Sequence, residues 1–233
     1  MLVFVVPLQS PAASTNWEKV SALAVRSLGA ILQQTNPAFH VFLVCNEPPN
    51  ALPVHPNLTV LRRDLPLPAA GARMLDKWSK VRIGLVAARR FAPCQIMVVD
   101  ADDLVSNRLA AHCAANQDMD GWIFDKGWLY DEGSRWLFSY SANFDAICGT
   151  SSIVRVKMED LPTEEEGGRA GNLILEAGHT KIRPVMRDRG RVLEPLPFRG
   201  AVYVLRTGEN DSGFTFPGCS SLRWQRESRL LLR

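Results

Sequence analysis

The sequence predicts an α/β domain with a mostly parallel central sheet flanked by helices and a smaller mixed sheet in its second half. In the first hundred residues, short apolar runs and helical patterns follow the order strand, helix, strand, strand, helix, strand. That order is typical of parallel strands whose crossover helices pack on the faces of the sheet. The second half contains only short apolar runs between turns, which favours a smaller mixed sheet.

The first half provides the clearest element boundaries. The capping-box pattern Thr15-x-x-Glu18 is expected to begin the first helix. The loop Asn46–Pro56 holds four prolines and separates the second and third strands. Strands are expected at Leu2–Val6, Val41–Cys45, Leu58–Leu61 and Ile96–Val99, and helices at Asn16–Gln34 and Ala72–Arg90.

The second half predicts less regular structure. A helix is expected within Glu164–Ala177. The C-terminal tail, Ser221–Arg233, carries arginines at every third position from Arg223 to Arg229. As a helix, this tail would either dock on the domain through Trp224 and its leucines or lie on an anionic membrane surface. Strands are expected at Trp122–Phe124, Trp136–Phe138, Ile147, Ile153–Val156 and Ala201–Leu205.

Composition narrows the class of protein. The 233 residues are 46% hydrophobic with a formal net charge of +3, so a sizeable core is expected and nucleic-acid binding is not. The five cysteines form no CxxC pair, which favours buried reduced thiols over a zinc or redox site. The apolar start ends at Pro7 and no run is long enough to span a membrane, so we expect a cytoplasmic protein. We expect one domain, residues 1–233.

The segment Asp100-Ala-Asp-Asp103 follows the apolar strand Ile96–Val99 directly. In an extended segment, Asp100 and Asp102 would point to one side and Asp103 to the other. Two carboxylates at the carboxyl end of a parallel strand suit Mg²⁺ or Mn²⁺, which keep open positions for water and phosphate oxygens. The other interpretation is a solvated acidic turn. The GxxxxGK[ST] and GxGxxG phosphate-binding loops are missing from the sequence.

With this DxD motif, the sequence resembles glycosyltransferases of the GT-A fold, and is similar to the family-2-like members. The resemblance spans most of the chain, and the DxD motif in its context is its specific part. The segments that carry it are Val5-Val-Pro7, Val44-Cys-Asn-Glu47, Asp76-Lys-Trp-Ser-Lys80, Val98-Val-Asp-Ala-Asp-Asp103, Cys148-Gly-Thr-Ser-Ser152, Gly178-His179 and Tyr203-Val-Leu-Arg-Thr-Gly-Glu-Asn210.

The resemblance implies a transferase that moves a sugar from a nucleotide-sugar donor, a UDP-sugar, to a saccharide or lipid-linked acceptor with Mn²⁺ or Mg²⁺. Residues 1–103 would bind the donor, and residues 104–233 would bind the acceptor. Asp100, Asp102 and His179 would form the metal site. The donor would contact Pro7, Gln9, Asn46, Asp64, Lys80, Asp100, Ala101, Asp102, Gly149 and Thr150.

Several features leave alternatives open. Inverting members of the family often carry an acidic motif that supplies the catalytic base, and this sequence has no clean match to that motif. The candidates for the base are Asp145 and Glu166. Glu166 ends an acidic run that would also suit the start of a helix. The alternative functions are a sugar nucleotidyltransferase and a non-catalytic nucleotide-sugar or carbohydrate-binding protein. Four aromatic residues would either stack on sugars or fill the core, with core packing favoured: Trp122, Trp128, Tyr130 and Trp136.

Overall fold

The computed structural model describes residues 1–66, 73–209 and 223–226 of the chain. The first half contains β1 (Leu2–Pro7), α1 (Trp17–Leu32), β2 (Phe39–Cys45), β3 (Leu58–Arg62), α2 (Arg73–Ala88) and β4 (Cys94–Val98). The second half contains β5 (Leu104–Val105), α3 (Leu109–Ala115), β6 (Gly121–Ile123), β7 (Gly127–Asp131), β8 (Trp136–Tyr140), β9 (Ser152–Val156), α4 (Leu173–Ala177), α5 (Ile182–Asp188), β10 (Glu194–Pro195), β11 (Ala201–Leu205) and β12 (Arg223–Arg226). Short 3₁₀ turns are η1 (Pro11–Ala13), η2 (Arg89–Phe91), η3 (Phe144–Ala146) and η4 (Met158–Asp160).

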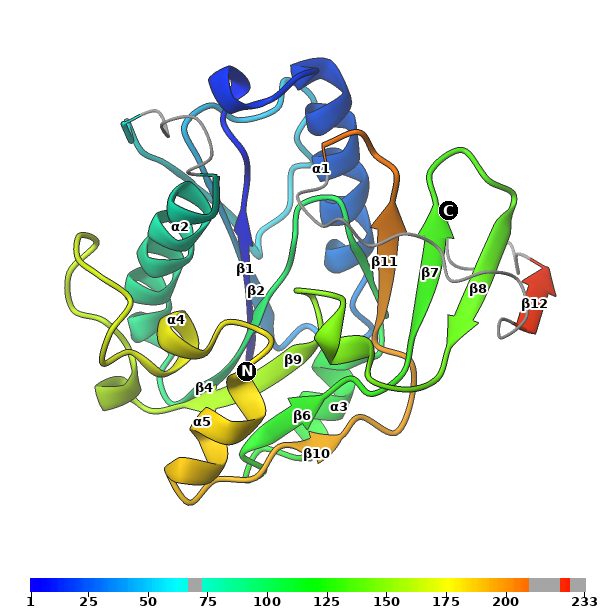
Figure 1. Cartoon of the computed structure of the whole chain (residues 1–233). Coiled ribbons are helices and arrows are strands. Elements are labelled where there is room, and N and C mark those ends of the chain that lie inside the picture. The colour runs from blue at the N-terminus through cyan, green and yellow to red at the C-terminus, as the bar shows by residue number, and fades with distance from the viewer. Residues whose placement is uncertain (67–72, 210–222, 227–233) are drawn as a thin grey trace.

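The larger sheet confirms the predicted fold class. In the described part of the chain it has seven strands in the order β10-β6-β9-β4-β1-β2-β3 (Figure 1). β1 pairs in parallel with β2 and β4, β2 pairs in parallel with β3, and β9 runs antiparallel between β4 and β6. The sheet is therefore mostly parallel, with one reversed strand in its second half.

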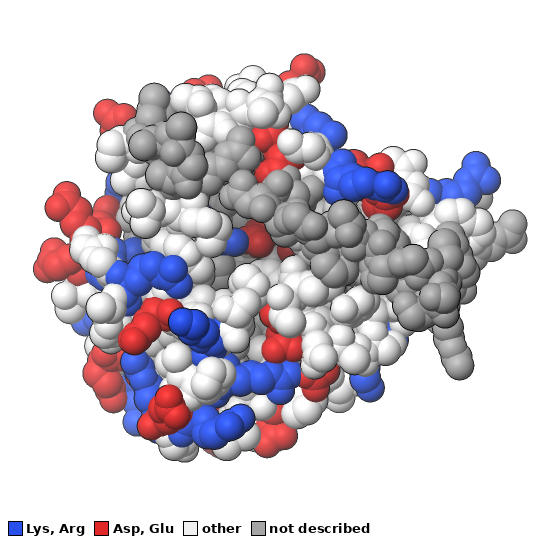
Figure 2. Space-filling model, in the orientation of Figure 1, with Lys and Arg blue, Asp and Glu red and all other residues white. Residues whose placement is uncertain are grey.

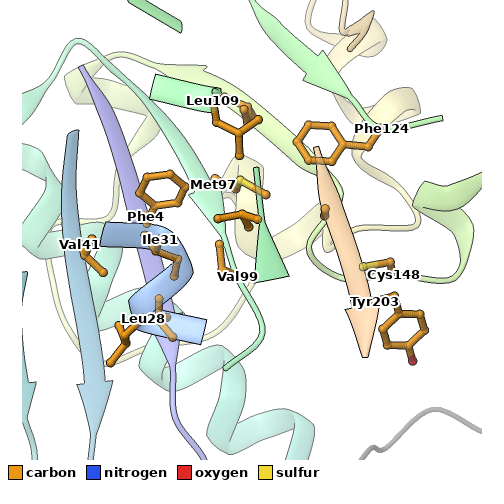
Figure 3. Close-up of a cluster of buried hydrophobic side chains, with 14 of the residues drawn as sticks. Phe4, Leu28, Ile31, Val41, Met97, Val99, Leu109, Phe124, Cys148 and Tyr203 are labelled. Atoms are coloured by element: carbon orange, nitrogen blue, oxygen red, sulfur yellow. The ribbon is translucent and has the colours of Figure 1, made fainter. Parts of the chain in front are cut away.

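The apolar strands are continuous because helices cover both faces of the sheet. In β1, Leu2, Phe4 and Val6 belong to the core cluster that contains the buried side chains of α1. The alternate residues Val3 and Val5 belong to the cluster on the other face, which contains the buried side chains of α2. The first cluster continues beyond the sheet to Tyr203 of β11, which joins the two halves of the molecule through one apolar core (Figure 3).

The smaller sheet lies beside α1 (Figure 1) and has the order β12-β8-β7-β11-β5. β11 pairs in parallel with β7 and antiparallel with β5, so this sheet is mixed, as predicted. Arg26 of α1 attaches the helix to this sheet: it pairs with Glu132 at 2.7 Å and lies over the Tyr130 ring. The second half thus packs on the helix that follows β1.

The start of α1 differs from the predicted capping box. Asn16, not Thr15, is the N-cap, and its side chain accepts a hydrogen bond from the Lys19 amide at 3.0 Å. Thr15 instead donates its amide and its hydroxyl to Glu209, which follows β11. A tertiary contact has displaced the local cap.

The helix expected within Glu164–Ala177 is present as α4, which begins only at Leu173 because Gly167 and Gly171 adopt positive φ before it. Two further predictions in the second half are wrong. Ile147 lies in a turn after η3 rather than in a strand. In the C-terminal tail, residues 223–226 form strand β12 antiparallel to β8, not a helix; the rest of the tail and its expected membrane contact lie outside the described residues.

Four of the five cysteines fall within the described residues, and all four are buried free thiols: Cys45, Cys94, Cys113 and Cys148. Cys219 lies outside the described residues. Among the helices that the structure describes, none has the length and apolar character needed to cross a membrane.

His40 gives a pH-dependent contribution to stability. Burial and the neighbouring Arg90 guanidinium lower its pKa from 6.5. The neutral ring therefore stabilises the fold above pH 6.5, and this contribution is lost as the pH falls through the lowered pKa. We expect the free energy of unfolding, measured in urea, to fall between pH 7.5 and pH 5, and the fall to be smaller in His40→Gln. Identical pH profiles for both proteins would contradict this assignment.

Candidate functional site

A cavity of about 550 Å³ opens at the carboxyl ends of β1 and β4. From β1 the chain passes through α1 to β2 on one side, whereas β4 lies on the other side of β1 after α2. This is the topological switch point at which open α/β sheets bind ligands. Figure 2 shows acidic and basic side chains meeting in a hollow near the middle of this face. The cavity is lined by Pro7, Leu8, Gln9, Val20, Leu23, Met74, Asp76, Lys77, Lys80, Asp100, Ala101, Asp102, Ala146, Ile147, Gly149, His179, Tyr203 and Glu209.

The acidic segment after β4 is a tight turn. The amide of Asp103 donates to the carbonyl of Asp100 at 3.0 Å, which closes the turn. Asp100 and Asp102 line the cavity, whereas Asp103 is fully buried. The predicted division of the carboxylates is therefore present, but a turn produces it rather than an extended segment.

Asp103 fixes this turn to the rest of the molecule. One of its carboxylate oxygens accepts the Val204 amide of β11 at 3.0 Å, and the other accepts the Cys148 thiol at 3.4 Å. Thr150 also bonds the Asp103 side chain, and its hydroxyl oxygen accepts the Asp100 amide at 2.9 Å. Thr150 is fully buried and does not line the cavity, so it positions the turn rather than contacting a ligand there.

Lys77 of α2 forms an ion pair with Asp100 inside the cavity. Burial alone would lower the pKa of Lys77, but the neighbouring Asp100, Asp103 and Asp102 together outweigh burial, so the pKa of Lys77 is raised. The amine therefore stays protonated beside the acidic turn. The sequence drew attention to Lys80 instead.

Lys80 lies one turn further along α2 and is fully buried. Its ammonium group bonds Asp76 at 2.7 Å, and the Asp76 side chain is only 8% exposed. Burial lowers the pKa of Lys80 despite this partner. Lys80 thus belongs to a buried ion pair in the cavity wall, and Lys77 is the more exposed of the two lysines.

The carboxylates of the turn oppose one another's ionisation. Burial and the negative charge of Asp100 raise the pKa of Asp102 to about 7. Burial, followed by Asp102 and Asp100, raises the pKa of Asp103 well above its ordinary value. The pKa of His179 is lowered by burial and by Lys77, so its ring is neutral at pH 7.

Asp100 and Asp102 are the residues that could hold a divalent cation. Mg²⁺ in phosphate sites is often bound through one or two carboxylates, with phosphate and water completing its shell, so the pair fits an ion shared with a diphosphate. Within the described residues, no three His, Cys, Asp or Glu side chains form a group that could hold a metal by themselves. His179 shares the cavity with the two aspartates without forming such a group.

Most of the other predicted site residues reach the cavity. Pro7, Gln9, Lys80, Ala101 and Gly149 line it.

Asn46 and Asp64 do not line the cavity. The Asn46 side-chain amide donates to the Leu65 carbonyl, and Asp64 is exposed.

The two predicted bases are outside the cavity wall. Both Asp145 oxygens are hydrogen-bonded by Arg183, at 3.0 and 3.3 Å, and Glu166 is exposed and is not among the lining residues. Asp125 binds the same guanidinium. The four aromatic residues proposed as a sugar platform do not line the cavity either, which agrees with the core-packing interpretation: Trp122, Trp128, Tyr130 and Trp136.

Sequence reasoning missed the cavity roles of Lys77 and Glu209 and the apolar wall. Glu209 accepts hydrogen bonds from the amides of Thr15 and Asn16, at 2.9 and 2.7 Å. The apolar wall comes from Leu8, Val20, Leu23, Met74, Ala146, Ile147 and Tyr203. The sequence held one signal for the cavity role of Lys77: it lies three residues before Lys80 on the helix that precedes the DxD strand.

No protein-family model matches the sequence, and a search of curated proteins finds no relative. Among solved structures, the chain is similar to residues 1–349 of TarS from S. aureus, with 13% identity and a TM-score of 0.48 over 87% of this chain and 60% of that one. The same TarS fragment in complex with UDP-GlcNAc gives 14% identity and a TM-score of 0.44, over 88% of this chain and 58% of that one. HddC from Yersinia pseudotuberculosis gives 11% identity and a TM-score of 0.35, over 88% of each chain.

Gly149 leaves the space that the Asp100 side chain occupies. A Cβ at this position would lie 2.5 Å from Asp100 Oδ2. We expect Gly149→Ala to displace this carboxylate and to lower the free energy of unfolding by about 1–3 kcal/mol, the usual range for overpacking. Gly168→Ala is the control, because a Cβ there meets nothing within 4 Å. A crystal structure of Gly149→Ala with Asp100 unmoved, or equal urea midpoints for the two variants, would contradict this steric role.

Proposed function

We propose that the protein is a metal-dependent glycosyltransferase that moves a sugar from a nucleotide-sugar donor, a UDP-sugar, to an acceptor hydroxyl. One observation carries the proposal: Asp100 and Asp102 are held at the switch point of a mostly parallel sheet and face a cavity of about 550 Å³. A cavity of this size falls in the range of small-molecule and cofactor sites. A saccharide or a lipid-linked sugar would be the acceptor.

In this reaction, the acceptor oxygen bonds to the anomeric carbon of the donor as the bond from that carbon to the diphosphate breaks. The nucleoside diphosphate leaves as an anion, and the acceptor proton passes to a base. A divalent cation, when bound, would neutralise the departing diphosphate. Asp100 and Asp102 would hold that cation, and the buried Asp103 would keep both carboxylates directed into the cavity.

His179 has two proposed roles. Metal binding and proton acceptance both need the neutral ring, and the lowered pKa of His179 provides it at pH 7. The resemblance noted from the sequence implies that His179 is a further metal ligand. Measuring Mn²⁺ affinity of His179→Ala in the presence of UDP separates these roles: a weakened affinity supports a ligand, and an unchanged one leaves the role of proton acceptor.

The residues after β1 favour a transferase over a sugar nucleotidyltransferase. A nucleotidyltransferase would need basic groups and glycines in this loop to bind the triphosphate of its substrate. Here the loop supplies Pro7, Leu8 and Gln9 to the cavity, and the Gln9 amide donates to the Ala13 carbonyl. A non-catalytic nucleotide-sugar-binding protein is the second candidate, because the cavity alone would suit it equally.

A metal-dependent transferase should hydrolyse its donor slowly when no acceptor is present. We expect release of UDP from a UDP-sugar in Mn²⁺, loss of that release in EDTA, and a decrease of at least about a hundredfold in Asp102→Asn, because removing a metal ligand should cost at least as much as loss of its supporting shell. Asp118→Asn is the matched control, since the Asp118 side chain is fully exposed. Wild-type turnover of Asp102→Asn in EDTA would disprove the metal site, and donor binding without turnover with any acceptor would favour the binding protein.

A further inference from the structure

Lys77 is paired with one of the two carboxylates that could hold a divalent cation. Its ammonium group pairs with Asp100 Oδ1, and the two side chains are 25% and 26% exposed. Both residues line the cavity. An ion on Asp100 and an ammonium on the same carboxylate would repel each other at short range, so the two cations compete for this oxygen.

The ion pair with Asp100 holds the Lys77 ammonium group in place beside the acidic turn. Gly149 leaves the pair its space, because a Cβ there would lie 2.5 Å from Asp100 Oδ2 and 3.4 Å from Lys77 Nζ. The pair therefore fits a slot between α2 and the loop before β9.

A bound diphosphate would give the Lys77 ammonium group a second anionic partner when it leaves Asp100. A lysine ammonium sits on a flexible four-carbon stem and forms charge-assisted hydrogen bonds with phosphate oxygens. A diphosphate that shares an ion with Asp100 and Asp102 would lie within the same cavity as Lys77. Lys80 cannot take this place without breaking its buried 2.7 Å bond to Asp76.

We propose that Lys77 is an exchangeable counter-cation, which holds Asp100 in the ligand-free protein and transfers to the donor diphosphate when the nucleotide binds, leaving Asp100 to a divalent ion. This inference rests on the proposed function, because it needs a diphosphate ligand and an ion at Asp100 and Asp102. It goes further by assigning to Lys77 the contact with the leaving group, and by making the same side chain oppose metal binding in the absence of nucleotide.

The two roles predict effects of opposite sign. Removing the Lys77 charge frees Asp100, so Mn²⁺ should bind more tightly when no nucleotide is present. The same change removes a cation from the diphosphate site, so UDP should bind more weakly when no metal is present. A lysine that only stabilises the fold would give neither effect.

The test compares Lys77→Met with the wild-type chain and with Lys126→Met, an exposed lysine that does not line the cavity. Mn²⁺ binding without nucleotide is measured by the electron paramagnetic resonance signal of the free ion, and UDP binding in EDTA is measured by calorimetry. We expect Lys77→Met to raise Mn²⁺ affinity and to lower metal-free UDP affinity, each by about tenfold, the usual size for one charged contact. Lys126→Met should leave both affinities unchanged.

A charge-retaining variant separates this role from a loss of folding. Lys77→Arg should bind UDP in EDTA with an affinity closer to the wild-type value than that of Lys77→Met. Its Mn²⁺ affinity without nucleotide should stay below that of Lys77→Met. Thermal unfolding midpoints show whether each variant is folded. If Lys77→Met is folded and its Mn²⁺ affinity is unchanged or weaker, the counter-cation role is wrong. If its metal-free UDP affinity is unchanged, the diphosphate contact is wrong. A wild-type protein that binds neither Mn²⁺ nor UDP would overturn the proposed function together with this inference, whereas one that binds both but shows no Lys77 effect overturns this inference alone.

Discussion

The buried carboxylate of Asp103 is the interaction on which the arrangement of the site depends. It joins the end of β4 in the larger sheet to the Val204 amide of β11 in the smaller one, and to Cys148 in the loop before β9. With this side chain directed inward, the turn places Asp100 and Asp102 in the cavity. A buried carboxyl group is costly unless it is hydrogen-bonded, and the bonds that meet this requirement also bring the two halves of the protein together at the site.

Three acidic groups in four consecutive residues create an electrostatic problem that the surrounding chain reduces but does not remove. Burial and mutual repulsion raise the pKa values of Asp102 and Asp103, while Lys77 provides a positive charge at Asp100. An excess of carboxylates therefore remains at this end of the cavity, where Asp100 and Asp102 could hold a divalent cation.

Local pattern and long-range packing explain which predictions succeeded. β1, β4, α1 and α2 were predictable because their apolar residues recur with a clear period over enough residues to outweigh other signals. Within Glu164–Ala177 the predicted helix is present but short, because two glycines with positive φ and the Arg63–Glu165 ion pair hold the first part of the region in turns.

The same distinction applies to the site. The pattern of a strand followed by DxD located Asp100 and Asp102, because a strand end has a fixed place in a parallel sheet. The choice between Lys77 and Lys80 depends on how α2 is rotated against β4, and the partner of Glu209 lies nearly two hundred residues away in sequence. Neither fact follows from spacing along the chain.

Glu209 shows how the segment after β11 completes the cavity. Its carboxylate accepts the amides of Thr15 and Asn16 just before α1, where the helix dipole favours negative charge. The residue follows β11, so this contact ties the smaller sheet to the start of the helix whose side chains Val20 and Leu23 form part of the apolar wall. Part of the apolar wall is therefore built by a helix whose start is bonded to the other half of the molecule. Because Asp103 and Glu209 each bond across the two halves, the polar and apolar sides of the cavity are held in one geometry by two separate carboxylates.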